Sequence, residues 1–342
     1  MEEPEGRESQ ATDVRDLYAD AGTPKDRRFA LLGTLISIGA LAGVVIWATK
    51  QEPPALPSGR AQILALLGAV AIYGFTTALR GERWWRLLED SEAHASRTDA
   101  YALTAVGYMG NNVLPARGGD VIRTVLLMPR SRVNARTIVG TLVAERLLDV
   151  LFLLSLFALL GYAVLRGIRT PDTQLLVFGG IGGVALLAVL ALTLYRLRDR
   201  PLVRRGLSLI APLARPTRRL RGVHAAAMFG WTALIWACEA LMFVLVAHSV
   251  GVEMDLLEAG YLMAVASVFL LIPAGPGYVG TLDAAIVFGL GAIGTDGSEA
   301  VSYLLMLRFV VFVPVTLAGV GLLLTRYRGS APLARPAGSR NA

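Results

Sequence analysis

A chain of 342 residues that is 54% hydrophobic and only 17% charged is too apolar for an ordinary soluble domain, which has about 25% charged residues. Several of its apolar runs reach the roughly 17–25 residues needed to cross a bilayer as a helix, so the composition predicts an all-α polytopic membrane protein. The net charge of +7 comes almost entirely from arginine. In a membrane chain this excess is typical of cytoplasmic loops, and no nucleic-acid partner is expected.

Taken in chain order, the apolar runs predict six full transmembrane helices and two interrupted segments. The full spans are 30–48, 61–79, 138–165, 175–195, 227–249 and 301–325. The interrupted segments are 101–128, broken around Pro115, and 259–292, broken around residues 273–277. Residues 1–28 and 326–342 are expected to be mostly disordered cytoplasmic tails that flank a membrane domain at 29–325.

The connections between these segments differ in charge. Clusters of arginine follow the second span and the first interrupted segment and fill the connection 196–222. The charged residues of 250–258 and 293–300, by contrast, are all acidic. Lysine and arginine concentrate in cytoplasmic loops. Every heavily basic connection falls on that side only if both interrupted segments are re-entrant, the first from the cytoplasm and the second from outside. We therefore expect a multi-pass protein of the cell (inner or plasma) membrane with both termini in the cytoplasm.

The two halves of the chain, about 30–165 and 175–325, have the same order of elements. The sequence "VLPARGGDV" from Val113 aligns with "LIPAGPGYV" from Leu271, which pairs Pro115 with Pro273. Arg146 and Arg308 pair at a similar offset. Three crossings per half turn the second half upside down, so the pattern predicts an inverted-topology repeat with a binding site where the interrupted segments meet near the midplane.

The interrupted segments have the composition of an anion site. Non-helical backbone is tolerated at membrane depth only where it is buried in protein or lines a wet cavity. A half-helix that begins after Pro115 would point its unpartnered N–H groups at the midplane, where they favour an anion. Gly118 and Gly119 would let a phosphate approach this backbone, and Gly277 and Gly280 would do the same at the second tip.

Charged side chains in apolar segments are costly and are therefore candidates for the site. The substrate-binding residues predicted from the sequence are Asn111, Asn112, Arg117, Gly118, Gly119, Asp120, Arg123, Glu145, Arg146, Asp149, Pro273, Gly275, Gly277, Asp283 and Arg308. Arg117 and Arg146 are the leading contacts, because a guanidinium binds two phosphate oxygens at once. An alternative stays open, in which the charges pair with one another, for example Arg146 with Asp120 or Asp149, and only fix the broken segment.

Other residues near the predicted spans have simpler interpretations. Asn111 and Asn112 either bind a head group or satisfy the broken backbone. Arg123 lies nearer the cytoplasmic face and is expected to snorkel toward it. Trp84 and Trp85, close to a span end, are expected to anchor the protein at the membrane interface.

Three segments resemble a known family in their order and spacing. The sequences "NNVLPARGGDVIRTVLL", "AERLLDVLFLL" and "IPAGPGYVGTLDAAI" are similar to signature segments of the lysylphosphatidylglycerol synthase transmembrane-region family, also called flippase-like membrane proteins, and the resemblance covers roughly 30–325. It implies a domain that handles phospholipid or polyprenyl-linked substrates. Fused members carry a soluble aminoacyl-transferase domain after the membrane part, and aminoacyl transfer is not expected of this chain, which ends at Ala342. Two residues depart from the family pattern: Asp120 stands where Glu is frequent, and Tyr278 where Gly is usual.

Three functions compete. The favoured one is a flippase-like protein that is not an enzyme and that binds and translocates an anionic phospholipid or a polyprenyl-phosphate-linked lipid. The alternative is a non-catalytic membrane partner or scaffold of a cell-envelope lipid or glycan synthesis enzyme. An enzyme is disfavoured, because Glu145 and Asp149 would make only a weak magnesium site. The three His are scattered and Cys238 is the one cysteine, so no metal, cofactor or internal disulfide is expected.

Overall fold

The computed structural model of the chain describes residues 24–91, 93, 95–114, 118–131, 133, 135–165, 222–269 and 275–328. Within these ranges the side chains at 24–34, 154, 157–165, 222 and 268 are not described. The predicted span 175–195 and the candidate site residues Arg117 and Pro273 lie outside the described residues.

Every regular element in the described ranges is a helix, as the composition predicts. The elements are α2 (Pro24–Ala48), α3 (Arg60–Asp90), α4 (Arg97–Val113), α5 (Gly118–Leu127), α6 (Ala135–Leu165), α10 (Gly222–Ser249), α11 (Leu256–Phe269), the 3-10 turn η2 (Pro276–Tyr278), α12 (Thr281–Ala292) and α13 (Gly297–Arg326). α2 begins at Pro24, a few residues inside the stretch that was expected to be a disordered tail.

Three of the described helices are long and apolar enough to cross a membrane. They are α3, residues 223–249 of α10, and α13, and they contain the predicted spans 61–79, 227–249 and 301–325. Shorter apolar helices cover Leu35–Ala48 and Leu256–Ser267. At 1.5 Å per residue, α3 is about 45 Å long, well above the roughly 30 Å of bilayer hydrocarbon. A fold with these helices is that of a multi-pass membrane protein.

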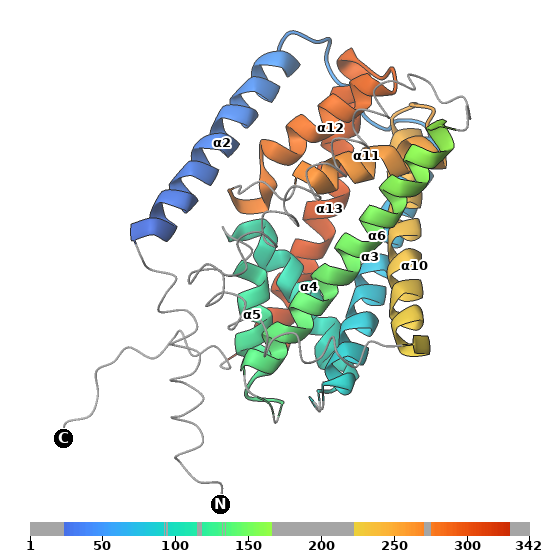
Figure 1. The fold of residues 1–342 in the computed structure, drawn as a ribbon. Coiled ribbons are helices and arrows are strands. Elements are labelled where there is room, and N and C mark those ends of the chain that lie inside the picture. The colour runs from blue at the N-terminus through green and yellow to red at the C-terminus, as the bar shows by residue number, and fades with distance from the viewer. Residues whose placement is uncertain are drawn as a thin grey trace, which may run out of the picture.

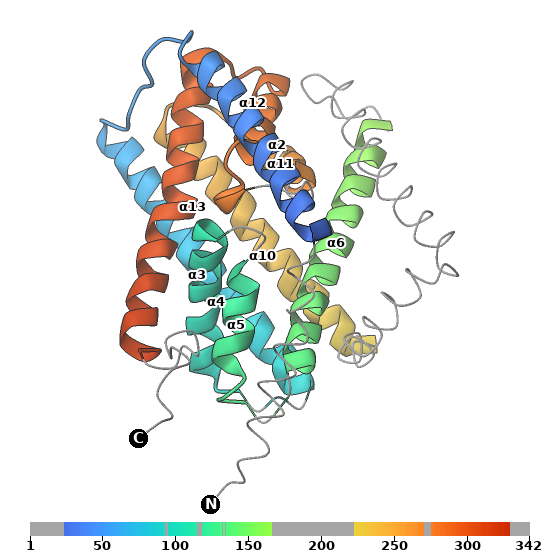
Figure 2. The ribbon, with the colours of Figure 1, turned by 90° about the vertical axis from the view of Figure 1, so that its left-hand side faces the viewer.

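The short helices occupy opposite ends of the molecule (Figures 1 and 2). α4 and α5 lie side by side at the end where α3 and α13 finish, which is the lower end in Figure 1. α11 and α12 pair at the opposite end, while α3, α10 and α13 run from one end to the other. We call the first end the basic end, because Arg86, Arg97 and Arg326 lie there, and the other the acidic end, because α11 and α13 begin there with Glu258 and Glu299.

Local signals explain where the short helices begin and end. α4 begins at a capping residue, since the Ser96 hydroxyl accepts a hydrogen bond of 3.0 Å from the Asp99 amide. The helix stops at Val113 because Leu114, which precedes Pro115, is extended with φ −99° and ψ 146°. α11 starts with a capping box, in which Asp255 accepts from the Glu258 amide at 2.8 Å and Glu258 accepts from the Asp255 amide at 2.9 Å.

Close backbone packing holds α4 against α5. A Cβ added to Gly119 would lie 1.8 Å from the Gly107 carbonyl oxygen, and one added to Gly110 would lie 2.7 Å from Gly119 Cα. Only glycine fits at such an approach, as at the small-residue interfaces of other membrane helices. Gly119 is therefore a packing residue, a role that the sequence did not suggest, and the approach of a phosphate to it stays a prediction.

Candidate functional site

A cavity of about 200 Å³ lies between the two halves of the chain. Its wall comes from α3, α4 and α6 on one side and from α10, α11, η2, α12 and α13 on the other. The charged residues of the wall are Arg80, Arg146, Asp149, Glu239 and Arg308, and its aromatic residues are Tyr73, Tyr108, Trp236, Phe243, Tyr278 and Phe312. The broken segments meet here, since a Cβ added to Gly277 would lie 3.1 Å from the Asn112 carbonyl oxygen.

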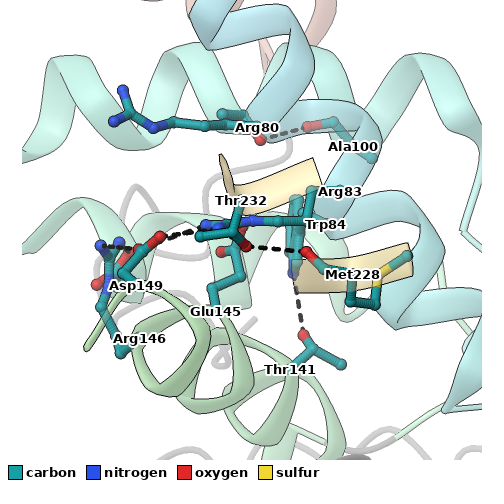
Figure 3. Close-up of polar contacts among 12 residues, drawn as sticks. Arg80, Arg83, Trp84, Ala100, Thr141, Glu145, Arg146, Asp149, Met228 and Thr232 are labelled. Atoms are coloured by element: carbon teal, nitrogen blue, oxygen red, sulfur yellow. Dashed lines mark hydrogen bonds and ion pairs between the residues drawn. The ribbon is translucent and has the colours of Figure 1, made fainter. Parts of the chain in front are cut away.

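Arg83 of α3 forms a buried ionic centre beside this cavity (Figure 3). Its side chain is 2% exposed and donates to Asp149 Oδ1 at 2.8 Å and to Thr232 Oγ1 at 2.9 Å. Glu145 Oε1 lies 3.7 Å from the same guanidinium. One arginine thus compensates two carboxylates of α6 that are one helical turn apart. Such a pairing makes the packing of α3, α6 and α10 mutually dependent.

Arg80, one turn earlier on α3, pairs with Glu239 of α10 and lies over the Tyr108 ring, whose centroid is 5.3 Å from the guanidinium carbon. Both charged groups line the cavity. The contact joins the first half of the chain to the second at the cavity wall.

Arg123 and Trp84 differ from what the sequence suggested. Arg123 does not snorkel: it is 3% exposed, donates to Glu145 Oε2 at 3.0 Å and stacks 3.9 Å from the centroid of Trp84. Trp84 is fully buried instead of lying at an interface, and its indole N–H donates to Thr141 Oγ1 at 3.0 Å. The stem of Arg123 rests on Gly107, where a Cβ would meet Arg123 Cδ at 2.5 Å. Both residues therefore stabilise the junction of α3, α5 and α6.

Arg146 of α6 is held more loosely than the other arginines of the cavity wall. Its nearest carboxylate atoms are Asp149 Oδ2 at 3.5 Å and Asp120 Oδ1 at 4.0 Å, and its side chain is 39% exposed. Arg80 and Arg308 are 11% and 18% exposed by the same measure. Asp120 also lies 3.6 Å from Arg123, so it is shared between two cations. Among the described residues of the wall, Arg146 consequently presents the most accessible positive charge.

Arg308 of α13 fastens the second tip. Its guanidinium donates to Asp283 Oδ1 at 2.5 Å, to the Gly277 carbonyl at 2.8 Å and to the Tyr278 carbonyl at 3.2 Å. Asp283 in turn accepts a hydrogen bond of 2.7 Å from the Gly280 amide at the start of α12. These contacts satisfy backbone groups that the break in the helix leaves without a helical partner.

Replacing Arg308 with lysine is expected to loosen this tip without changing the charge. Lysine has no planar fork, so it cannot bind a carboxylate and two carbonyl groups together. We expect faster amide hydrogen exchange across 277–283, measured by mass spectrometry. Arg326→Lys at the far end of the same helix is the matched control and should leave exchange at these amides unchanged. Equal exchange in both variants would contradict this role of Arg308.

Three residues of the second tip have positive φ, and one of them, Gly280 with φ 89°, precedes α12. Gly277 has φ 62°, and Tyr278, the one described residue other than glycine with positive φ, has φ 54°. Glycine adopts this conformation at no steric cost, whereas a tyrosine is strained there. A glycine at this position, which the family resemblance implies, would be free of this strain. In this chain Tyr278 also lines the cavity.

The side-chain amides of Asn111 and Asn112 at the first tip form hydrogen bonds with the backbone of that tip and with a neighbouring helix. The Asn111 side chain accepts a hydrogen bond of 3.0 Å from the Gly119 amide, and the Asn112 side chain donates to Thr316 of α13 at 3.0 Å. Both residues also line the cavity. At the second tip, the Gly275 amide donates to Ser37 Oγ of α2 at 2.7 Å. Gly118 faces Leu114 of its own segment.

The structure brings most of the predicted site residues together but gives them unequal positions. Asn111, Asn112, Arg146, Asp149, Gly277 and Arg308 line the cavity. Asp120, Arg123, Glu145 and Asp283 lie behind the wall as ion-pair partners. Among the described residues, no group of three or more His, Cys, Asp or Glu side chains is arranged to hold a metal ion.

Arg80 and Arg83 belong to this centre although the sequence assigned them to a cytoplasmic loop. The spacing of residues along the sequence of α3 could have identified these two arginines as internal. Tyr73, Arg80, Trp84 and Leu87 recur at helical spacing, and all four are buried in the structure. The apolar face of α3 thus continues past residue 79, and the arginines on it are internal.

The helical fold and its internal ionic cavity define a multi-pass membrane protein. Over residues 30–319 the sequence matches the family described as the lysylphosphatidylglycerol synthase TM region. The chain belongs to this family, as its three signature segments predicted.

Two curated relatives are known by name. One is "Glycosyltransferase AglD" of Haloferax volcanii, which is 25% identical over 328 residues that cover 84% of this chain and 52% of the relative. The other is "UPF0104 membrane protein PH1989" of Pyrococcus horikoshii, 22% identical over 334 residues that cover 85% of this chain and 96% of the relative. The chain thus spans about half the length of the first relative and nearly all of the second. No solved structure gives a significant match.

Proposed function

We propose that this protein binds an anionic lipid, either a phospholipid or a polyprenyl-phosphate-linked lipid, by its head group in the cavity and moves that head group across the membrane. The observation that carries the proposal is Arg146. It lines a cavity at the meeting point of the broken segments, and both of its carboxylate contacts are long: a hydrogen bond of 3.5 Å to Asp149 and an ion pair of 4.0 Å with Asp120.

A loosely paired arginine at such a place is ready to exchange its partner. A phosphate offers two oxygens that fit the guanidinium fork, and this bidentate contact is stronger than a single long ion pair. Asp149 would not be left unpaired in the exchange, because Arg83 already donates to it at 2.8 Å. Asp120 would still form its ion pair with Arg123 at 3.6 Å. The ionic centre therefore tolerates the transfer of Arg146 from carboxylates to a ligand.

The cavity suits a head group more than a whole lipid. Its volume of about 200 Å³ is below the roughly 300–1,000 Å³ of ordinary small-molecule pockets. The acyl or polyprenyl chains would stay in the surrounding hydrocarbon while the polar group crosses. The relative named a glycosyltransferase makes a sugar-bearing polyprenyl phosphate one candidate among the lipids to be tested.

The inverted repeat is part of this proposal. Asp120 and Asp283 both lie in the first turn of the second arm of a broken segment, on α5 and α12. Each faces an arginine on the next described helix, Arg146 at 4.0 Å and Arg308 at 2.5 Å. These equivalent pairs support two related halves, with α4–α5 re-entering from the cytoplasm and α11–α12 from outside. We include the six-span topology with cytoplasmic termini in the same proposal.

Replacing Arg146 with glutamine is expected to slow lipid movement at least tenfold. The assay is reconstitution of the full chain into vesicles that contain fluorescent phosphatidylglycerol, fluorescent phosphatidylcholine or fluorescent polyprenyl phosphate, with dithionite quenching as the readout. Arg60→Gln, at an exposed position, is the control for loss of one positive charge. Native mass spectrometry of the same samples reports whether the lipid is retained. A wild-type rate equal to that of protein-free vesicles for every lipid, or an unchanged rate in Arg146→Gln, would overturn the proposal.

A second candidate function is that of a non-catalytic membrane partner of a cell-envelope lipid or glycan synthesis enzyme. The observation in its favour is that this chain spans only 52% of a relative named for glycosyl transfer. Constant co-purification of one such enzyme, with no lipid movement by the isolated chain, is the result that would favour this candidate over the first.

A further inference from the structure

A second hollow lies far from the central cavity, at the basic end of the molecule. It is an open groove of about 460 Å³ between the start of α4 and the last turns of α13. Its wall is made by Arg97, Thr98, Tyr101 and Ala102 on one side and by Leu322 and Arg326 on the other. The groove thus combines an apolar floor with an arginine on each side.

The packing of α4 and α13 explains where the groove begins and ends. The two helices touch at Gly319, where a Cβ would lie 2.4 Å from Met109 Cβ. At the polar end they are tied again, because Arg326 donates to Thr98 at 3.0 Å and the Tyr327 hydroxyl donates to Asp99 at 2.9 Å. Thr98 and Arg326 form this second contact and are also part of the groove wall, so the shape of the groove is set by the fold.

Positive charge exceeds negative charge around the groove. Glu82 is shared by two arginines, Arg97 at 2.7 Å and Arg86 at 2.8 Å. Asp99 pairs with Arg326 at 3.1 Å. Burial raises the pKa of Asp99, but its hydrogen bonds with Ser96, Tyr327 and Arg326 outweigh that effect and hold its pKa below the ordinary value. Asp99 is therefore ionised at neutral pH and neutralises only one arginine.

The uncompensated charge is accessible from outside. Both carboxylates are nearly enclosed, with side chains 4% and 11% exposed, whereas Arg97 and Arg326 are 57% and 42% exposed. An anion that approaches the groove from the membrane surface meets guanidinium groups on both sides.

We propose that this groove binds one anionic phospholipid of the surrounding leaflet, with the phosphate between Arg97 and Arg326 and an acyl chain along Ala102 and Leu322. An apolar groove that ends in arginines at the basic end of a membrane protein matches the apolar chain and the negative head group of such a lipid. The lipid would lie against the outside of the α4–α13 pair as a bound neighbour. This site is independent of the central cavity and of the function proposed for it.

The test is native mass spectrometry of the full chain titrated with phosphatidylglycerol or phosphatidylcholine. Arg97→Gln/Arg326→Gln is expected to weaken phosphatidylglycerol binding at least tenfold. The matched control is Lys50→Gln/Arg60→Gln, which removes the same charge at the opposite end and should bind as the wild type does. A second variant, Leu322→Trp, keeps both arginines and fills the groove, so it should also lose the lipid. Arg146→Gln should keep the groove lipid, which native mass spectrometry counts as a separate bound molecule from any lipid in the central cavity.

Each result decides the matter. Preferential binding of phosphatidylglycerol that is lost in the double variant and in Leu322→Trp, but kept in the control and in Arg146→Gln, supports the groove. Equal binding in the double variant and the control would overturn it, and so would equal binding of the two phospholipids by the wild type. Loss of the lipid in Arg146→Gln alone would assign it to the central cavity instead.

Discussion

Methionine in place of Arg83 is expected to destabilise the fold by about 3–5 kcal/mol, the cost of leaving buried charge without its partner. Asp149 would lose its 2.8 Å hydrogen bond and Glu145 one of its two arginines, while Thr232 would lose a donor. Methionine keeps much of the side-chain volume, so the loss reports charge and hydrogen bonding more than packing. Thermal unfolding of the purified protein in detergent, followed by near-ultraviolet circular dichroism, measures the effect.

Two further variants make the Arg83 result specific. Arg86→Met removes the same group three residues later on the same helix, from a side chain that is 40% exposed, and should change stability by less than about 1 kcal/mol. Adding Asp149→Asn to Arg83→Met should recover part of the loss, because the buried site then holds one carboxylate fewer. Equal unfolding temperatures for Arg83→Met and Arg86→Met would show that the centre around Arg83 does not hold these helices together.

Alanine at Gly119 is the second substitution with a large expected effect, a loss of about 3 kcal/mol from overpacking. The new methyl group would lie 1.8 Å from the Gly107 carbonyl oxygen, which belongs to helix backbone and cannot rotate away. Separation of α4 and α5 would also break the hydrogen bond between the Gly119 amide and Asn111. Differential scanning fluorimetry with a thiol-independent dye measures the change.

Gly74→Ala is the matched control for Gly119→Ala. Gly74 lies inside α3, and a Cβ there meets no atom within 4 Å. Alanine should therefore stabilise the protein by about 0.5–1 kcal/mol through helix propensity alone. A stability change of the same sign in both glycine variants would contradict the close approach of α4 and α5.

Much of the architecture could be predicted because long apolar runs and proline breaks act locally. The helical class, the break before Pro115 and the pairing of short helices in each half follow from patterns within about 30 residues. Residues at 166–221 and the tips at 115–117 and 270–274 lie outside the described ranges, so the fourth span and the contacts of Arg117 and Pro273 stay predictions.

The roles of individual charges were harder to predict, because they depend on contacts distant in sequence. Arg80 meets Glu239, and Arg83 meets Asp149 and Thr232, across 159, 66 and 149 residues. Counting loop arginines treats every cation near a span end alike, so it placed these two outside the bundle. The packing role of Gly119 was missed for a similar reason, because nothing in "ARGGDV" shows that another helix backbone lies against it.

The internal arginines of α3 have a consequence for how the protein is made. When α3 leaves the ribosome, the carboxylates that will pair with Arg80 and Arg83 are not yet synthesised, since they belong to α6 and α10. An isolated membrane helix pays at least about 2.5–3.5 kcal/mol for each such charge at its centre. The second part of α3 is therefore expected to wait near the aqueous surface during translation and to move to its final depth only when α10 arrives. Membrane insertion of the first half of the chain is therefore completed only after α10 of the second half has been synthesised.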